Sequence, residues 1–365
     1  MTVPGTQQPR FEAAAPAAAA VPLVEIRNLR VQLPTRDGVV TAIDGMDMTI
    51  GRGEIVALVG ESGSGKSMTA LSIARLLPPM ARIASGEVLL DGVDLLTLPD
   101  AEMNRVRGAR IAMLFQQPKA TLDPTSRVGD QVGEALRFRR GATARLAWER
   151  SVELLGDVGI PEPQRRARAY AHQLSGGMAQ RVMTAAAISG GPELLIADEP
   201  TTALDVTVQA QILRLLTAMV REHGLSMLLI THDLGIVSTV ADRVVVMYAG
   251  KVVEHGPVSQ ILSHPSHPYT EALMRSSLLI PNQHGRLYAI PGGAPRPGEQ
   301  LVGCRFRARC QYADALGIAA RCESAEPGLH VCESGHLCRC WAVEEGLIDV
   351  QPTDPIRRRV TEETT

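Results

Sequence analysis

The sequence has few aromatic residues and almost no excess of either charge. Phe, Trp and Tyr together account for 3% of its 365 residues, against 45% for all hydrophobic residues, so the core must consist mainly of Ala, Leu, Val, Ile and Met. The formal net charge of −2 supplies no basic surface of the kind that nucleic acids bind. We therefore expect no nucleic-acid partner.

Long hydrophobic runs are also missing. No run of about 18 apolar residues occurs, and a membrane-spanning helix needs about that length. If the protein works at a membrane, we expect another polypeptide to hold it there. The Ala-rich residues 11–22 are interrupted by one Glu and two Pro, which favours a disordered tail over a secretory signal. We expect two such tails, residues 1–21 and 349–365.

Cysteine is absent from the first 300 residues, and all six cysteines follow that point. A secreted protein held together by disulfides would not leave most of its chain free of cysteine. This distribution favours a reducing compartment and a local metal site in the C-terminal part.

Hydrophobic patterning predicts an α/β fold. Apolar and polar residues alternate in 23–33 and 39–50, as in two half-buried strands of an antiparallel hairpin. Residues 54–59, continuously apolar after Glu54, are typical of a strand buried on both faces of a parallel sheet. Residues 118–187 are Arg-rich and mostly helical in pattern, which predicts a helical subdomain inserted into the sheet domain. Further buried-strand patterns occur at 194–198, 226–231 and 243–247.

Residues 60–67, Gly-Glu-Ser-Gly-Ser-Gly-Lys-Ser, match the phosphate-binding loop (P-loop) pattern in full. They lie between the buried run and an expected helix over 68–77, a setting that a chance Gly/Ser-rich turn would not need. In such a loop the backbone N–H groups face the β-phosphate, Lys66 lies between the β- and γ-phosphates, and the Ser67 hydroxyl binds Mg²⁺. The expected ATP-binding residues here are Gly60, Ser62, Gly63, Ser64, Gly65, Lys66 and Ser67.

The buried segment 194–198 ends in Asp198, and Glu199 follows it. An apolar strand that ends in Asp-Glu is common and by itself would be interpreted as a solvated strand end. Downstream of a P-loop, we expect Asp198 to hold Mg²⁺ through water and Glu199 to orient or deprotonate the attacking water.

Leu-Ser-Gly-Gly at 174–177 resembles the signature motif of ATP-binding-cassette (ABC) ATPases. On its own this segment would be only a helix cap. The resemblance implies that Ser175, Gly176 and Gly177 bind a γ-phosphate from the N-terminus of a helix.

Three more motifs extend the ABC resemblance, in the family's order, over about residues 23–262. Gln116 resembles the Q-loop residue, which contacts Mg²⁺ and the membrane partner. Asp205 closes an Ala-Leu-Asp sequence that resembles the D-loop, which contacts the opposite subunit. His232 resembles the H-loop histidine, which senses the γ-phosphate, although a lone His after a strand is usually structural.

The resemblance implies a fold and an assembly. The fold is a P-loop NTPase cassette with a RecA-like mixed or parallel sheet core, an antiparallel β hairpin region and the inserted helical subdomain. Each ATP lies between the P-loop of one subunit and the signature motif of another, so this chain must pair with a second ABC ATPase subunit, identical or related. One feature departs from the family: residues 37–41 contain no aromatic to stack on adenine, where Val39 or Val40 offers an aliphatic surface.

The C-terminal part selects a branch of this family. His-Pro-Ser-His-Pro-Tyr at 264–269 and the Pro/Gly/Arg-rich 291–310 resemble the extension of dipeptide and oligopeptide importer ATPases. We therefore expect an ABC nucleotide-binding domain over 22–262 and a Cys-rich extension over 263–348. The implied partners are two transmembrane permease subunits and an extracytoplasmic peptide-binding protein, with this subunit peripheral on the cytoplasmic face of the cell membrane.

Four cysteines fill the family's cysteine pattern: Cys304, Cys310, Cys322 and Cys340. The intervals of five, eleven and seventeen residues do not match the tight spacing of zinc ribbons or bacterial ferredoxins, so spacing alone indicates four thiols that could converge. The resemblance implies a [4Fe-4S] cluster, with zinc and free or paired thiols as alternatives. Nearby arginines would offset the cluster's negative charge. Cys332 and Cys338 are additional, and Cys338 could compete with Cys340.

These motifs predict an ATP-hydrolysing subunit that powers import of dipeptides or oligopeptides, with ATP, Mg²⁺ and a [4Fe-4S] cluster bound. One alternative is a soluble ABC-type ATPase of DNA repair or translation, although the sequence has neither a long coiled-coil insertion nor a second cassette. Another is an importer ATPase for a different solute, such as a metal complex. A third treats the Cys-rich extension as a metal-sensing module.

Overall fold

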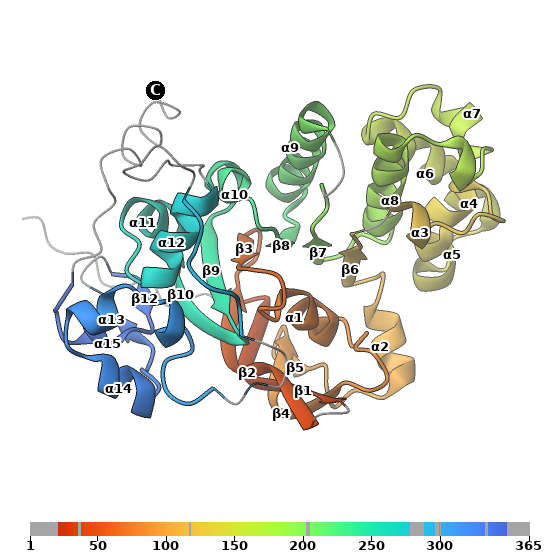
Figure 1. The fold of residues 1–365 in the computed structure, drawn as a ribbon. Coiled ribbons are helices and arrows are strands. Elements are labelled where there is room, and N and C mark those ends of the chain that lie inside the picture. Colours follow the sequence, from red (N-terminus) through yellow and green to blue (C-terminus); the bar gives the residue numbers. More distant parts are fainter. Residues whose placement is uncertain are drawn as a thin grey trace, which may run out of the picture.

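The structure is a computed structural model, and it describes residues 21–35, 38–116, 118–201, 205–277, 288–295, 299, 301–332 and 335–348 (Figure 1). The expected tails, except residue 21, lie outside the described residues, as do Ala203 and Leu204 of the D-loop. Among the described helices, none is both long enough and apolar enough to cross a bilayer.

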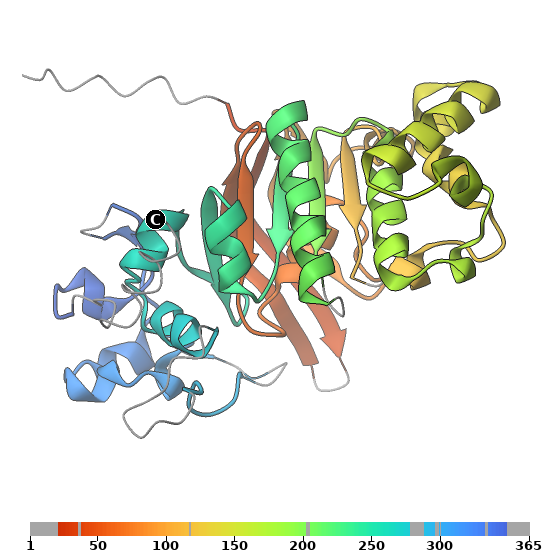
Figure 2. The same cartoon turned by 90° about the horizontal axis from the view of Figure 1, so that it is seen from above.

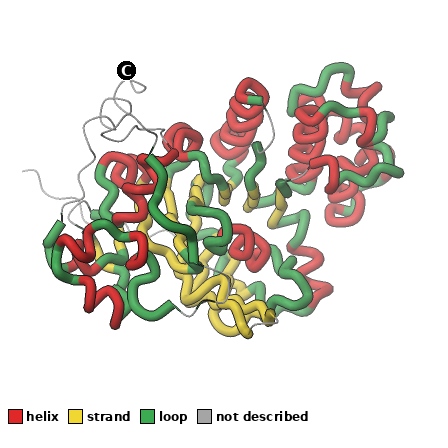
Figure 3. Tube along the Cα trace, in the orientation of Figure 1, coloured by secondary structure: helices red, strands yellow, loops and turns green. Residues whose placement is uncertain are grey.

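Strands run from the middle of the molecule to its lower edge in the view of Figure 3, with helices above them and on both sides. The strands are β1 (Val24–Thr35), β2 (Gly38–Ile50), β3 (Ile55–Val59), β4 (Arg82–Leu90), β5 (Val93–Asp94), β6 (Ile111–Leu114), β7 (Leu194–Asp198), β8 (Ser226–Ile230), β9 (Arg243–Tyr248), β10 (Lys251–Pro257), β11 (His330–Val331) and β12 (Leu337–Cys338). The α-helices are α1 (Lys66–Ile73), α2 (Asp100–Val106), α3 (Pro118–Thr121), α4 (Val128–Val132), α5 (Glu134–Arg140), α6 (Ala144–Asp157), α7 (Pro163–Ala167), α8 (Gly176–Ser189), α9 (Val206–His223), α10 (Leu234–Val240), α11 (Val258–Ser263), α12 (Pro268–Ser277), α13 (Tyr312–Ala315), α14 (Ala319–Ser324) and α15 (Trp341–Glu344). Two 3₁₀ turns are η1 (Ala171–Gln173) and η2 (Arg307–Arg309).

The main sheet has the order β11-β12-β10-β9-β3-β8-β7-β6. Strands β9, β3, β8, β7 and β6 run parallel, and β10 turns back antiparallel to β9. Both faces of the parallel part are covered: Leu228 and Ile230 pack towards α1 and the second sheet, while Met227 and Leu229 pack towards α9. Burial on both faces explains the continuous apolar runs, and the predicted parallel strands are confirmed.

The second sheet is antiparallel, with the order β2-β1-β4-β5. Strands β1 and β2 form the predicted hairpin, with Thr35 opposite Gly38 at its closed end. Strand β4 also pairs with β1, and the sequence pattern did not reveal it. Only Val88, Leu89 and Leu90 at its end are buried, so the strand lacks the alternation that marks its neighbours.

Helix α1 is shorter than predicted, because it begins at Lys66 and ends at Ile73 rather than spanning 68–77. Arg75 has a φ of 50°, a left-handed conformation that glycine usually supplies after a helix. The Leu76 N–H donates to the carbonyl of Leu71 at 2.8 Å, which closes the helix with a six-to-one hydrogen bond. The helix could not have continued much further, since residues before proline avoid the helical region and Leu77 precedes Pro78.

Helices α3 to α8 form a group with a hydrophobic core of its own. This core includes Leu122, Val128, Val132, Leu154, Leu155, Val158, Ile160, Leu174 and Val182. Figures 1 and 2 show this group and the C-terminal segment α13–α15 at opposite ends of the molecule, with the sheets between them. The predicted fold class, including an inserted helical subdomain, is confirmed.

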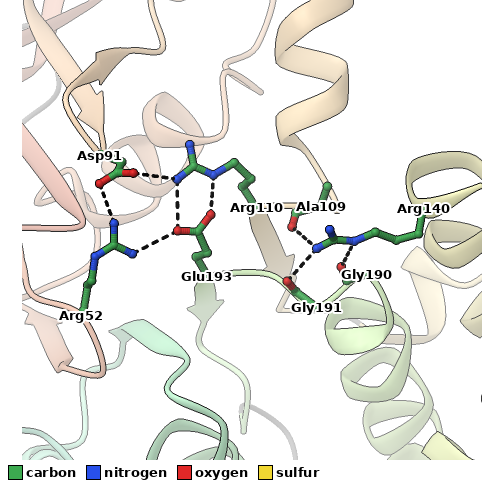
Figure 4. A network of polar contacts seen from close by, with 8 residues as sticks. All are labelled: Arg52, Asp91, Ala109, Arg110, Arg140, Gly190, Gly191 and Glu193. Atoms are coloured by element: carbon green, nitrogen blue, oxygen red, sulfur yellow. Dashed lines mark hydrogen bonds and ion pairs between the residues drawn. The ribbon is translucent and has the colours of Figure 1, made fainter.

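An ion-pair network ties the two sheets together at the amino ends of the parallel strands (Figure 4). Glu193, just before β7, accepts from Arg110 at 3.1 Å and from Arg52 at 3.2 Å. Asp91 accepts from both arginines, at 2.5 Å from Arg52 and 3.5 Å from Arg110. These partly exposed pairs bridge β4 to β7, and each alone contributes little stability.

The helical group joins the core through a close backbone contact beside this network (Figure 4). At the C-terminal end of α5, Arg140 donates to the carbonyls of Gly190 at 2.7 Å, Gly191 at 3.1 Å and Ala109 at 3.0 Å. A Cβ added to Gly190 would lie 1.8 Å from the carbonyl oxygen of Gly108. Only glycine allows the end of α8 to approach the α2–β6 turn this closely.

We predict that Gly190→Ala lowers the free energy of unfolding by about 1–3 kcal/mol, because the added methyl must push two backbone segments apart. Chemical denaturation measures this change. Gly328→Ala is the matched control, since a Cβ there meets nothing within 4 Å. Equal stability of the two variants would contradict the close contact.

Candidate active site

The P-loop fits tightly between neighbouring strands. It follows β3, and its glycines Gly60 and Gly65 have φ values of 148° and 108°. A Cβ at Gly60 would lie 2.2 Å from the carbonyl oxygen of Met247 in β9, and one at Gly65 would lie 2.6 Å from that of Ala42 in β2. Both backbone conformation and space therefore require glycine at these two positions.

The Lys66 side chain is buried inside the loop. Its Nζ donates to the carbonyls of Gly60 at 2.8 Å and Glu61 at 2.9 Å. Burial lowers the pKa of Lys66, and the negative charges of Glu199, Asp198 and Glu61 act in the opposite direction. The loop thus holds a partly desolvated ammonium where an anionic phosphate would offset the cost of burying it.

Two oxygen donors lie together at the start of α1 and the end of β7. The Ser67 hydroxyl donates to Oδ1 of Asp198 at 3.3 Å. Burial raises the pKa of Asp198, the Ser67 hydrogen bond lowers it, and the neighbouring charge of Glu199 raises it further. A divalent cation favours such oxygen ligands and would keep this carboxyl ionised.

The three predicted catalytic side chains meet beyond the carboxyl ends of β6, β7 and β8. Nε2 of Gln116 donates to Oε2 of Glu199 at 2.7 Å. Nδ1 of the exposed His232 lies 3.6 Å from Oε1 of the same carboxylate. Glu199 has a φ of 47°, held by the bond from its N–H to the Ile230 carbonyl at 3.0 Å. A non-glycine residue in this strained conformation is typical of functional sites.

The signature and D-loop residues lie on other elements. Ser175 caps α8 and accepts from the N–H of Met178 at 3.3 Å, and Ser175 and Gly176 are exposed. Gly177 packs against α9, and a Cβ added to it would lie 3.0 Å from the Val208 side chain. Asp205 caps α9 through the N–H of Val208 at 2.9 Å. Among the described residues, no hydrogen bond joins these positions to the P-loop.

Sequence reasoning missed Glu61, the second residue of the P-loop. Arg309 binds its carboxylate with two hydrogen bonds of 2.7 and 3.0 Å, and its N–H donates to the Tyr269 hydroxyl at 2.8 Å. The P-loop pattern accepts any residue at this position. The His-Pro-Ser-His-Pro-Tyr segment and the Pro/Gly/Arg-rich 291–310 resemble the importer extension, but the sequence does not indicate which residue they contact.

The four predicted cysteines line one cavity, together with Phe306 and Trp341. Burial raises the pKa of Cys304 and of Cys340 to about 12, and it also raises the pKa of Cys310 and Cys322. In the part of the chain that the structure describes, no three His, Cys, Asp or Glu side chains are grouped closely enough to hold a single metal ion. The donor set consists of soft thiols, which suit Fe–S clusters or zinc.

The other two cysteines do not line this cavity. Cys338 lies in β12 and Cys332 directly follows β11. Both pack in one buried cluster with Cys340, but neither is among the residues that line the cavity. Hydrogen bonds from Cys338 and His336 lower the pKa of Cys332 to about 4, although burial opposes the thiolate. Cys340 rather than Cys338 thus faces the other three predicted ligands.

A fully buried carboxylate anchors the extension to the main sheet. Glu254 in β10 accepts from the N–H groups of Ser266 at 2.6 Å and His267 at 3.1 Å, and its Oε1 lies 2.6 Å from Nε2 of His336. Burial opposes the charged imidazolium, but the hydrogen bonds to Cys332 and Glu254 raise the pKa of His336 to about 9. The His-Pro-Ser-His-Pro-Tyr segment therefore serves to satisfy Glu254.

Known protein families match both parts of the chain. Residues 43–202 match the family model described as ABC transporter, and residues 253–315 match that described as oligopeptide/dipeptide transporter, C-terminal region. A peptide import ATP-binding protein of Brucella melitensis is 46% identical over 336 residues, 89% of this chain and 98% of the relative. A peptide ABC transporter ATP-binding protein of Sinorhizobium fredii is 44% identical over 88% of this chain and 96% of the relative. The chain belongs to the ATP-binding subunits of the oligopeptide/dipeptide ABC transporter family.

Solved structures support the same conclusion for the cassette. The ATP-binding cassette MJ0796, a dimer bound to ADP and Pi, is 30% identical with a TM-score of 0.59, over 64% of this chain and 98% of that one. The cbiO1 protein of Clostridium perfringens, part of an ABC transporter complex, is 28% identical with a TM-score of 0.56, over 66% and 90%. This ABC subunit is an ATPase whose hydrolysis is coupled to transport.

We predict that His267 makes the folded state of this protein less stable at acidic pH. Burial lowers the pKa of His267 to about 3, against 6.5 in the unfolded chain, and its Nδ1 accepts from the N–H of Tyr269 at 2.9 Å. The unfolded state therefore gains a proton first, so stability is complete above pH 6.5 and is lost as the pH falls towards 3. Between pH 7 and 5 this loss amounts to about 2 kcal/mol.

Denaturation at several pH values measures this effect against His267→Asn, whose amide oxygen lies where Nδ1 does and can accept the same hydrogen bond without titrating. The wild type should lose more stability than the variant on acidification. Parallel pH curves would show that His267 is not the group responsible.

Proposed function

We propose that this ATPase powers the import of dipeptides or oligopeptides across the cytoplasmic membrane, bound peripherally to its cytoplasmic face. The observation that carries the ATPase chemistry is the meeting of Gln116, Glu199 and His232 beside the P-loop, at one edge of the parallel sheet. The peptide cargo is supported by the match of residues 253–315 to the oligopeptide/dipeptide extension and by the names of the relatives.

Each residue of the site has a chemical role in this proposal. Lys66 and the loop N–H groups hold the β- and γ-phosphates, and Ser67 with Asp198 holds Mg²⁺, which neutralises phosphate charge when bound. Glu199 orients and deprotonates the attacking water. The 2.7 Å bond from Gln116 holds the Glu199 carboxylate in place. His232, whose Nδ1 lies 3.6 Å from the same carboxylate, would sense the γ-phosphate.

The second half of each ATP site comes from another ABC subunit, identical or related. Ser175 and Gly176 are exposed at the N-terminus of α8, a helix of 14 residues, where free N–H groups and the helix dipole favour an anion. We assign Ser175, Gly176 and Gly177 to the γ-phosphate of the partner's ATP, and Asp205 to the contact between subunits. The further partners are two permease subunits, reached through the surface around Gln116, and an extracytoplasmic peptide-binding protein.

The four thiols of the cavity hold a [4Fe-4S] cluster in this proposal. Four converging cysteines match the usual ligand set of such a cluster. Their raised pKa values mean that the buried thiolates need a cationic partner, and iron supplies it. The cluster would join three segments of the extension, because Cys304 and Cys310 flank η2, Cys322 lies in α14 and Cys340 precedes α15.

We predict that Glu199→Gln lowers the ATPase rate by about 100-fold or more, since it removes the general base, while ATP still binds. Vesicles that contain the wild-type subunit and its membrane partners should take up labelled dipeptide. Vesicles that contain the Glu199→Gln subunit should not. Glu193→Gln, at the opposite end of β7, is the matched control and should support both activities. ATP-driven peptide uptake by the Glu199→Gln assembly would refute the assigned role.

Metal analysis tests the cysteine cavity separately. After anaerobic purification we expect about four iron and four acid-labile sulfide per chain. Cys304→Ser should lose them, while Cys332→Ser, whose side chain lies outside the cavity, should keep them. Zinc, or no metal in the wild type, would contradict the cluster and leave the ATPase assignment unaffected.

A further inference from the structure

We propose that the segment Cys304–Cys310 of the extension is a positioning element of the ATP site, with Arg309 as the positioning residue that holds the P-loop through Glu61. This inference rests on the proposed function of residues 60–67 as the phosphate-binding loop. It joins two parts of the chain that the sequence presents as separate domains.

Glu61 is the point where the extension and the P-loop meet, and every polar group of this residue is used. Its carbonyl accepts from Nζ of Lys66 at 2.9 Å and from the N–H of Ser64 at 3.2 Å. Its N–H donates to the Tyr269 hydroxyl at 2.8 Å. Its carboxylate receives the two hydrogen bonds from Arg309. A shift of the Glu61 carboxylate would therefore also move the Glu61 carbonyl that accepts the hydrogen bond from Lys66.

Arg309 is itself held rigidly, as a positioning residue must be. Only 6% of its side chain is exposed. Besides Glu61, its guanidinium donates to the Pro291 carbonyl at 2.8 Å and the Tyr248 hydroxyl at 3.4 Å. The guanidinium also lies 5.9 Å from the centroid of the Phe306 ring. A planar guanidinium with this many fixed partners cannot be replaced by the single point charge of lysine.

The segment Cys304–Cys310 also supports the other side of the P-loop, through a second arginine. Arg305 donates to the carbonyl of Ala249 and pairs with Asp44 of β2. Gly250, which follows Ala249 in the chain, donates its N–H to the Ser64 carbonyl at 3.0 Å. Between the two arginines, Phe306 is buried against Tyr248 and Tyr269. One short segment therefore supports the loop on two sides.

Such support matters because a phosphate-binding loop works by preorganisation. Its N–H groups must face inwards before the nucleotide binds, because ordering them during binding would cost free energy. The P-loop glycines Gly60, Gly63 and Gly65 provide freedom, with positive φ at each, and so need an external restraint. Because Arg309 touches no phosphate-facing group, its loss should weaken nucleotide binding without altering the chemical step.

The decisive experiment measures the Kd of Mg·ATP and the ATPase KM and kcat for the full-length Arg309→Lys protein. We expect Kd and KM to rise roughly 10- to 150-fold, the range for losing hydrogen bonds to a charged group, with kcat changed by less than about twofold. Arg110→Lys is the matched control, because it disrupts an equivalent Arg–Glu pair with Glu193 at the far edge of the sheet. It should leave Kd unchanged.

Two further variants keep the test decisive if Arg309→Lys fails to fold. Tyr269→Phe removes the acceptor for the Glu61 N–H and should also raise Kd, whereas Tyr312→Phe, whose hydroxyl binds Glu271 at 2.7 Å, should not. Combining Arg309→Lys with Glu61→Gln should add little to either single change if the pair is the route of the effect.

The outcomes separate this inference from the proposed function. A normal Kd in folded Arg309→Lys and Tyr269→Phe proteins, with wild type and Arg110→Lys binding ATP, overturns the positioning role alone. A wild type that binds no Mg·ATP overturns the assignment of the P-loop and, with it, this inference. A fall in kcat at unchanged Kd also overturns it, because Arg309 would then act on the chemical step.

Discussion

The parallel alignment of β3, β7, β8 and β6 is the constraint on which the rest of the molecule depends. Parallel strands end at the same edge, so the P-loop, Gln116, Glu199 and His232 meet there although they are far apart in the chain. Burial on both faces, by the second sheet on one side and α9 and α10 on the other, fixes this alignment. The site is thus built by the same packing that forms the core.

The extension is an integral part of this arrangement. Its strand β12 pairs with β10, placing Cys338 opposite Glu254, so the main sheet continues into the C-terminal part of the chain. A carboxylate with no exposed surface costs several kcal/mol unless it is fully hydrogen-bonded, and His336 with two backbone N–H groups meets that demand. This buried anchor lets the neighbouring Cys304–Cys310 segment lie against the P-loop in a single position.

Prediction succeeded where a pattern has one physical cause and failed where two segments had to meet. Continuous apolar runs indicated the parallel strands, because burial on both faces disfavours polar side chains. Strand β4 was not predicted because only its last three residues are buried. The end of α1 was predicted too late because Arg75 adopts a conformation usually left to glycine. The bond between Glu61 and Arg309 spans 248 positions, and neither residue carries a local signal.

The sequence by itself determined the chemistry: a P-loop, an Asp-Glu pair after a buried strand and four thiols in the C-terminal part. These are local features, since residue type and nearest neighbours specify them. Tertiary structure alone decided which of these groups meet. Gln116 donates a hydrogen bond to Glu199, and Cys340 rather than Cys338 faces the cavity. Arg309 of the extension binds Glu61 of the P-loop. Such meetings depend on the packing of the whole chain, which no single segment encodes.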